Sequence, residues 1–371
     1  NRGTPIAVKL LAQTLGEQGH SVHLLVFHEG EEISLPNVTI HRSASLPGIR
    51  DIKPGLSLKK LICDFFVFLK AIRLLRSGSF DLVHAVEEAV FMALALKFLF
   101  RIPYVYDMDS LMSLQLVEKY PSLHLLRRGM EWLEKKAVQN SSGTIAVCRA
   151  LEDTARKFAP SNLIVRLEDI TLLTDAAEEQ DSLRQRLGIP GTMLMYVGNL
   201  EKYQGIDLLI ESFREALDTT AAAYLVIIGG SQDDILFYKQ RVEQLSMEGR
   251  VFFCGQRPVD MLGSYLSQAD ILVSPRIQGN NTPMKIYSYL DSGKAVLATK
   301  LPTHTQVLDD SIACLVAPEK TSMAAGIITL VNNAELRKNL GARARERVKS
   351  EYSLPVFKKK VAAFYQALFL R

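Results

Sequence analysis

The stretch from Gly279 to Thr299 carries residues that are well suited to bind an anion. A polar loop leads into a predicted helix with Thr282 as the N-cap and Pro283 at the first helical position, and Lys285 follows in the first turn. Free backbone N–H groups at the start of a helix favour a phosphate, whereas a lysine there opposes the helix dipole unless an anion is bound beside it. A plain, well-capped loop–helix–strand unit would explain the same residues.

Alternating helices and strands position this segment. The predicted helix ends at Gly293, and the strand-forming run 295–298 follows. The same alternation along the chain indicates parallel sheets covered by helices on both faces, with ligands at the carboxyl ends of the strands. Strands are predicted at 21–27, 38–41, 81–85, 103–107, 143–147, 193–197, 223–228, 251–254 and 271–274, and helices at 5–18, 55–76, 88–100, 111–140, 205–218, 232–247, 258–268 and 351–370.

The length of 371 residues suggests two domains. The acidic, weakly patterned run 168–181 is typical of a connection between them. Because the chain opens with a turn that leads directly into a helix, whereas an α/β domain normally begins with a strand, we expect that a first strand is missing from this sequence. The predicted parts are a domain at 1–165, a connection at 166–190, a second domain at 191–350 and a final helix at 351–371.

Composition excludes several classes of protein. Hydrophobic residues make up 48% and charged residues 23%, which is ordinary for a globular protein. The net charge of +4 comes without a dense basic run interleaved with aromatics, so no nucleic-acid partner is expected. No uninterrupted apolar run is long enough for a transmembrane helix. Four scattered cysteines predict reduced thiols in a cytoplasmic protein, and the dispersed histidines predict no metal site.

Short motifs occur through both predicted domains, at the opening Gly3 loop, 17–22, 81–84, 102–107, 196–209, Gly255, 269–270, 274–275 and 285–299. On these motifs the chain resembles the family-4 retaining glycosyltransferases, which have the GT-B fold of two Rossmann-like, doubly wound domains facing a central cleft. The resemblance implies that the second domain binds a nucleotide diphosphate sugar and the first an acceptor, a glycan or a lipid-linked glycan. Transfer to the acceptor hydroxyl would retain the anomeric configuration and need no cofactor or essential metal, and the final helix would pack back on the first domain.

The chain departs from the family where the donor diphosphate would bind. The family has an arginine and a lysine at the positions of Asn199 and Gln204, whose amides donate hydrogen bonds but supply no charge. Lys285 and Lys202 are expected to supply it instead, although a solvated loop lysine would explain Lys202 equally well. The predicted donor-binding residues are Gly198, Asn199, Lys202, Gln204, Gly255, Asn281, Thr282, Pro283, Lys285 and Ser288.

The family also has two glutamates, at the positions of Asn280 and Ser288. The Asn280 amide can still bind sugar hydroxyls, and we assign it a catalytic role. Ser288 would hold the ribose weakly or through water. The loss of both acids leaves open a catalytically silent GT-B domain that serves as a binding partner in polysaccharide assembly. A GT-B epimerase is a third class, but the chain lacks an evident set of carboxylates for it.

Five residues of the first domain are candidates for the acceptor side. Asp109 is the predicted catalytic carboxylate, or alternatively a helix N-cap. His84 follows a strand and would face the acceptor, or be a hydrogen-bonded interior histidine. Glu87 would contact the acceptor or simply start the next helix. Gly3 and Thr4 are expected at the first strand–helix turn, close to the donor phosphate or acceptor.

Two helical regions carry an excess of basic residues. The region 55–76 has five lysines and arginines against Asp64 alone, and the region 124–136 adds four more. Such faces dock some family members on anionic membranes, so we predict peripheral contact with the inner face of a membrane. Solvated helix faces would explain the same charges.

Overall fold

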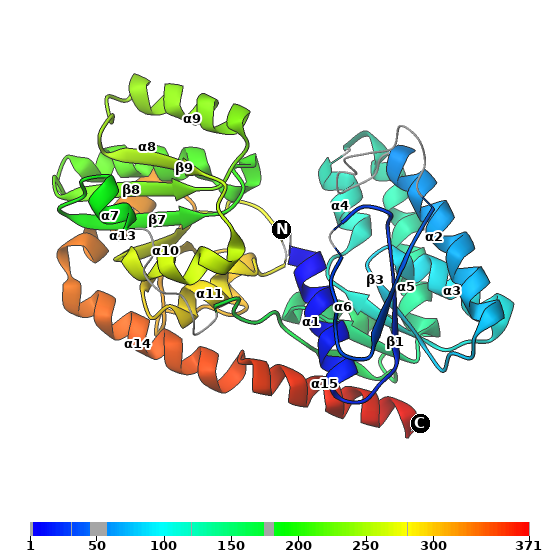
Figure 1. Cartoon of the computed structure of the whole chain (residues 1–371). Coiled ribbons are helices and arrows are strands. Elements are labelled where there is room, and N and C mark those ends of the chain that lie inside the picture. The colour runs from blue at the N-terminus through cyan, green and yellow to red at the C-terminus, as the bar shows by residue number, and fades with distance from the viewer. Residues whose placement is uncertain are drawn as a thin grey trace. The chain divides into compact units, whose positions relative to one another are not determined.

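The computed structural model describes residues 3–30, 32–44, 58–119, 121–173, 182–279 and 281–370. The chain divides into two compact units (Figure 1). Unit 1 comprises Asn1–Glu168 together with Phe357–Arg371, and unit 2 comprises Asp169–Val356. The division after Glu168 lies within the connection predicted at 166–190.

Unit 2 is built on one six-stranded parallel sheet with the order β12-β11-β10-β7-β8-β9. The chain moves outward from β7 to β9 on one side, then returns to place β10 against the other edge of β7. In open α/β sheets, ligands bind beyond the carboxyl ends of the strands at such a reversal point. The strands are β7 (Thr192–Val197), β8 (Ala223–Ile228), β9 (Val251–Gly255), β10 (Ile271–Ser274), β11 (Ala295–Thr299) and β12 (Cys314–Val316).

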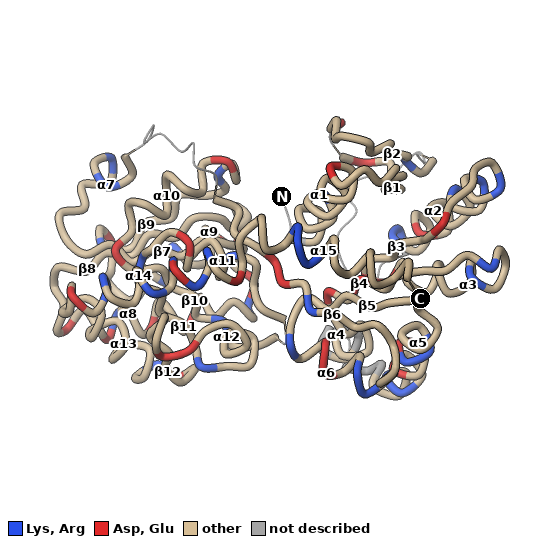
Figure 2. The backbone as a smooth tube through the Cα atoms, turned by 90° about the horizontal axis from the view of Figure 1, so that it is seen from below, with Lys and Arg blue, Asp and Glu red and all other residues tan. Residues whose placement is uncertain are grey.

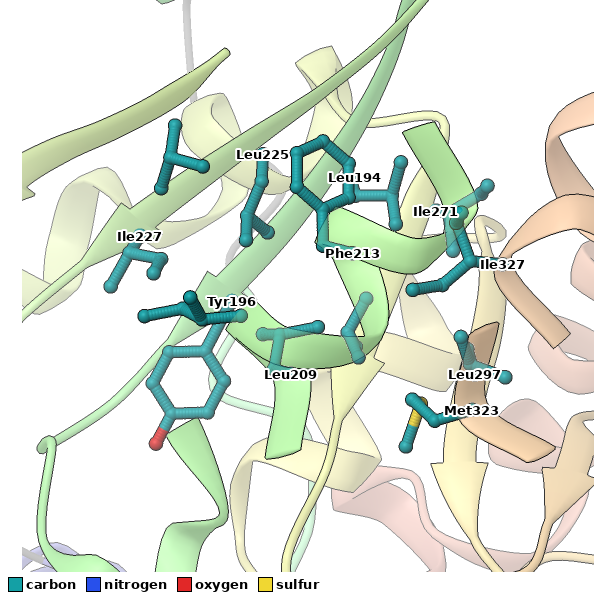
Figure 3. Close-up of a cluster of buried hydrophobic side chains, with 14 of the residues drawn as sticks. Leu194, Tyr196, Leu209, Phe213, Leu225, Ile227, Ile271, Leu297, Met323 and Ile327 are labelled. Carbon is teal, nitrogen blue, oxygen red and sulfur yellow. The ribbon is translucent and has the colours of Figure 1, made fainter. Parts of the chain in front are cut away.

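The sheet of unit 2 is buried on both faces because alternate residues of its strands enter two hydrophobic clusters. Leu194 and Tyr196 of β7 pack on one face with Phe213 (Figure 3), and Met193 and Met195 pack on the other. The helical segments are α7 (Leu183–Arg186), η2 (Lys202–Gln204), α8 (Ile206–Leu217), α9 (Gln232–Gln244), η3 (Val259–Met261), α10 (Leu262–Gln268), α11 (Lys285–Asp291), α12 (Pro302–Thr305), α13 (Lys320–Asn332) and α14 (Ala334–Glu351).

Unit 1 holds two parallel sheets, β1-β2 and β3-β4-β5-β6. The strands are β1 (Val22–Val26), β2 (Val38–Arg42), β3 (Val83–Val86), β4 (Tyr104–Met108), β5 (Gly143–Ala146) and β6 (Ile164–Arg166). The helical segments are α1 (Gly3–Glu17), α2 (Leu58–Ser77), α3 (Ala89–Phe100), α4 (Met112–Lys119), η1 (Pro121–Leu126), α5 (Arg127–Asn140) and α6 (Arg149–Phe158), together with most of α15 (Leu354–Phe369).

Helix α15 joins unit 1 through specific contacts. The Lys358 ammonium donates to Glu17 at 2.5 Å, and Lys360 donates to Glu168 at 2.6 Å. The ring of Phe364 lies so close to Gly143 that a Cβ there would be 2.8 Å from it. The end of the chain therefore completes the unit that its beginning forms.

Several sequence predictions are wrong in detail. The helix predicted over 111–140 is three segments, α4, η1 and α5, and Pro121 explains the break because it has no N–H and its ring disrupts a continuous helix. Gly3 and Thr4 lie in the first turn of α1 rather than in a strand–helix turn. The sequence prediction also missed β6 and β12, each three residues long.

Candidate anion-binding site

Glycines allow the loops at the carboxyl ends of β7, β8 and β10 to approach one another. Gly205 has φ +73°, and a Cβ on it would lie 2.0 Å from the carbonyl oxygen of Pro275. Gly229 has φ +115°, and its Cβ would lie 2.0 Å from the carbonyl oxygen of Gly198. Only glycine combines these backbone angles with such close packing. The loops after the central strands are thus drawn together at the reversal point of the sheet.

Lys285 directs its side chain into this convergence. It is the first residue of α11, and its Nζ donates to Gln204 Oε1 at 3.2 Å and lies 4.0 Å from the centre of the Tyr196 ring. A Cβ on Gly198 would be only 3.3 Å from Nζ. Among the residues that the structure describes, no carboxylate pairs with this ammonium. The partners of the Lys285 ammonium are therefore an amide oxygen and an aromatic ring.

Burial sets the charge state of Lys285. Desolvation lowers the pKa of its ammonium well below the usual lysine value, and the nearby positive charge of Arg276 lowers it further. A bound anion would act in the opposite direction by favouring the charged form. An anion bound beside Lys285 would therefore stabilise the charged form that burial disfavours.

Arg276 is a second cation beside the loop, and the sequence prediction did not include it. It follows β10, its side chain is largely buried, and its guanidinium lies 5.0 Å from the centre of the Tyr203 ring. Nη1 donates to the carbonyl oxygen of Asn281 and to Thr303 Oγ1, both at 3.1 Å. An arginine two residues beyond the end of a buried strand was the signal in the sequence, because ligand-binding groups gather at that edge.

Three buried polar residues, His304, Ser274 and Thr299, form a hydrogen-bonded layer that contacts the backbone of Arg276. His304 Nδ1 contacts the Thr299 carbonyl oxygen at 2.8 Å, and Nε2 contacts Ser274 Oγ at 2.9 Å. Burial lowers the pKa of His304 to about 4, although its bond to Thr299 opposes this effect, so the ring is neutral at pH 7. A neutral ring that donates from Nδ1 accepts from Ser274 at Nε2. The Thr299 hydroxyl donates to the carbonyl oxygen of Arg276 at 2.5 Å.

The structure brings only some of the predicted donor-binding residues together. Gly198, Gln204 and Lys285 meet as described above. Lys202 and Asn199 are exposed, although the carbonyl oxygen of Asn199 accepts a bond from the buried Tyr196 hydroxyl at 2.6 Å.

Two further predicted donor-binding residues, Gly255 and Asn281, lie in different places. Gly255, with φ +67°, ends β9, and its carbonyl oxygen accepts from Gly229 N–H. Asn281 is held by Arg276, as described above. Asn280 lies outside the described residues.

Helix α11 begins later than the sequence predicted. It starts at Lys285 with Met284 in the capping position, so Thr282 is not the N-cap and Pro283 is not the first helical residue. The physical reason is that Thr282 points inward. Its hydroxyl is buried and has no hydrogen-bond partner within the described part of the chain. The carbonyl oxygen of Pro283 accepts from Ile286 N–H and begins the first turn.

Ser288 has a structural contact that the sequence prediction did not anticipate. Its side chain is fully buried, and Oγ accepts a bond from the backbone N–H of Leu172 at 3.0 Å. The hydroxyl therefore ties the segment at the start of unit 2 to α11. A role in holding a ribose stays a prediction.

In unit 1, His84 lies in a hydrogen-bonded chain. Its Nδ1 is 2.6 Å from the Tyr365 hydroxyl of α15, and its Nε2 is 3.1 Å from Asp107 Oδ2 of β4. Both ring nitrogens thus have protein partners, as an interior histidine would. Glu87 follows β3 with φ +49°, and burial raises the pKa of its carboxyl group.

Asp109 directly follows β4 and is half-buried. The start of the next helix, α4, is capped from a distance. The carboxylate of Glu134 in α5 accepts from the backbone N–H groups of Met112 at 2.6 Å and Ser113 at 3.3 Å. A catalytic role for Asp109 stays a prediction.

The described residues contain neither a metal-binding cluster nor a membrane-spanning helix. No group of three His, Cys, Asp or Glu side chains there could hold a metal ion. No helix in the same residues combines the length and apolar character needed to cross a membrane.

The doubly wound sheet of unit 2, the parallel sheets of unit 1 and the returning helix α15 define the GT-B class, as the sequence predicted. Over its full length the chain is similar to sucrose-phosphate synthase from Thermosynechococcus elongatus, with a TM-score of 0.80 and 19% identity over 100% of this chain and 94% of the other. HepE from Anabaena, solved with UDP-glucose, gives a TM-score of 0.73 and 16% identity over 97% and 96% of the two chains.

Two family models account for the two units. Residues 2–165 match Glycosyltransferase Family 4, and residues 179–347 match Glycosyl transferases group 1. Each unit of the chain is therefore similar to one of two glycosyltransferase domain families.

Several curated relatives match only part of the chain. Phosphatidyl-myo-inositol mannosyltransferase from Mycolicibacterium smegmatis is 24% identical over 223 residues, which is 59% of this chain. The match spans 56% of that relative's length, and matches to two further relatives span 48% and 45% of theirs.

Proposed function

We propose that the protein transfers a sugar from a nucleotide diphosphate sugar to an acceptor hydroxyl. The observation that carries this proposal is the Lys285 ammonium, which lies between Gly198 and Gln204 without a carboxylate partner among the described residues. A departing diphosphate gathers negative charge, and a preorganised cation in a partly buried site stabilises it strongly. Arg276 adds positive potential to the same place.

The fold and the solved neighbours support the donor class. HepE was solved with UDP and with UDP-glucose. The reversal point of a doubly wound sheet is where nucleotides bind in this architecture. We therefore propose a nucleotide diphosphate sugar as the donor, bound by unit 2 at the ends of β7 and β10.

The proposal extends to the leaving group, the stereochemistry and the residues near the sugar. Lys285 would stabilise the leaving diphosphate without a metal ion, and the anomeric configuration would be retained. Asp109 and Asn280 would act near the sugar, with the Asn280 amide in place of a family glutamate. Glu87, at a strand end of unit 1, would contact the acceptor.

A screen of nucleotides and nucleotide sugars by thermal shift tests this function. One nucleotide, together with its sugar conjugates, should raise the melting temperature. The conjugate that binds should then be turned over, with transfer to an acceptor or slow hydrolysis. Binding without any turnover would favour the silent binding domain, and no binding at all would contradict the proposal.

A second proposal concerns the acceptor side, and it rests on exposed apolar residues beside basic ones. On α2, Leu61 and Phe65 are 54% and 56% exposed, and on the contacting helix α3 Phe98 is 72% exposed. Figure 2 shows Lys and Arg on α2, α3 and α5. We define the α2–α3 patch as two exposed apolar groups with the basic residues near them. Because Lys60 pairs with Glu88, the two helices start side by side, so Leu61, Ile62 and Phe65 lie near their starts and Phe98 and Leu99 at the end of α3. The basic residues are Lys59, Lys70, Arg73, Arg76 and Arg101.

An apolar surface edged by cations suits an anionic membrane. The name of the mycobacterial relative specifies a phosphatidylinositol acceptor for that protein. We propose that this protein acts at a membrane surface on a lipid-linked acceptor.

A further inference from the structure

We propose that Arg276 and Thr303 form a clamp that positions the loop at Asn281 and thereby sets the affinity for the donor. Both are positioning residues, because they act through the loop rather than on the reacting atoms. The inference rests on the proposed function of the same site. It adds two residues that neither the sequence motifs nor the family resemblance assigned.

The clamp closes on one backbone carbonyl group. The oxygen of Asn281 accepts from Arg276 Nη1 at 3.1 Å and from the Thr303 hydroxyl at 2.6 Å. Arg276 Nη1 also donates to Thr303 Oγ1 at 3.1 Å, so the three groups form a closed triangle. Two donors on one oxygen fix the position of the chain more narrowly than one would.

The loop is tethered at further points around the guanidinium. The N–H of Ile277 donates to the carbonyl oxygen of Tyr203 at 3.0 Å, and the Tyr203 ring stacks on Arg276. Gly279 has φ +119°, and a Cβ on it would be 2.5 Å from Nη2. The backbone thus bends tightly around the side chain of Arg276, and a planar guanidinium suits these contacts better than an ammonium would.

The clamp itself stands on rigid supports. Thr303 is fully buried in α12, next to His304 of the polar layer, and the backbone of Arg276 is held by Thr299. Movement of the loop therefore requires breaking bonds at buried groups. Because Lys285 begins the helix that follows this loop, the clamp also determines where its ammonium lies.

The test is nucleotide affinity in variants that keep the fold. Thr303→Val removes the hydroxyl at nearly constant shape, and Thr303→Ser keeps it. The clamp predicts about tenfold weaker binding of UDP-glucose, or of the conjugate found in the screen, by Thr303→Val. Thr303→Ser should bind as the unchanged protein does. Thr305→Val, at an exposed threonine of the same helix, is the matched control.

Arg276→Lys separates geometry from charge, because lysine keeps the positive charge but lacks the planar guanidinium with its paired N–H donors. The clamp predicts that Arg276→Lys raises the donor KM about tenfold and leaves the acceptor KM unchanged, whereas a purely electrostatic role predicts a normal donor KM. Normal affinity in Thr303→Val and Arg276→Lys, with affinity lost in Lys285→Ala, would overturn the clamp and leave the proposed function intact. Absence of nucleotide binding by the unchanged protein would contradict both.

Discussion

At the scale of single residues, Lys285 couples donor binding to proton uptake. Burial lowers the pKa of its free ammonium, and a bound diphosphate raises it. Between these two pKa values, binding takes up a proton, so affinity falls as the pH rises. Calorimetry at one pH in two buffers of different ionisation enthalpy measures this uptake directly. The nucleotide sugar is the right ligand because its diphosphate does not titrate near neutral pH.

Lys285→Arg provides the control for this linkage, because arginine stays protonated throughout. The variant should show no buffer-dependent heat. Equal heats in both buffers for the unchanged protein, measured across the range from neutral to mildly alkaline pH, would contradict the expected coupling.

His304 makes the stability of unit 2 depend on pH. Its pKa falls from 6.5 to about 4 in the fold because burial disfavours the charged ring. The stabilisation is complete above pH 6.5 and is lost as the pH falls towards 4, by about 3 kcal/mol in total. Urea unfolding at several pH values measures it. The variant His304→Gln should lose less unfolding free energy between pH 6.5 and pH 4 than the unchanged protein. An equal loss in both proteins would contradict the role given to His304.

Single residues also show what sequence reasoning can find. Lys285, Gln204 and Gly198 were recognisable because each lies beside a glycine turn or a helix start in a known pattern. Thr303 was not, because it contacts Asn281 across 22 residues of sequence. Arg276 left only the signal of its place after β10, and its contact with Thr303 could not be predicted. Such a pairing exists only after β10 and β11 lie side by side.

At the scale of helices, strands and loops, the close approach of two loop backbones explains why some positions require glycine. Gly205 and Gly188 both have positive φ, +73° and +61°, but a Cβ on Gly188 would meet nothing within 4 Å. Gly188→Ala should therefore cost about 1 kcal/mol of unfolding free energy for the backbone angle alone. Gly205→Ala should cost clearly more, because its Cβ collides with the backbone at Pro275. Denaturant unfolding compares the two variants. Equal losses of unfolding free energy would contradict the close approach of the backbone at Gly205 and Pro275.

The alternation of helices and strands could be predicted, since buried strands leave apolar runs and helices leave a longer period. The residues at which the helices begin were harder to predict from the sequence. Glu134 caps α4 from a different helix, and Thr282 turns its hydroxyl into the interior. In both places a distant contact, rather than the local motif, decides where the helix begins.

At the scale of the whole molecule, the α2–α3 patch predicts binding to anionic vesicles. Phe65→Asp should reduce co-sedimentation with phosphatidylglycerol-containing vesicles, because it places a negative charge in the apolar part of the patch. Phe237→Asp in α9 is the matched control, since Phe237 is 58% exposed but belongs to unit 2. Equal loss in both variants, or no binding by the unchanged protein, would contradict the proposed membrane contact.

The central claim is that unit 2 binds a nucleotide diphosphate sugar at the ends of β7 and β10 through Lys285. Titration calorimetry of the unchanged protein, Lys285→Ala and the exposed control Lys239→Ala with the nucleotide sugar tests it most directly. Lys285→Ala should weaken binding roughly tenfold to a hundredfold, since a charged hydrogen-bond partner is lost, while Lys239→Ala should have no effect. Unchanged affinity in Lys285→Ala would contradict it.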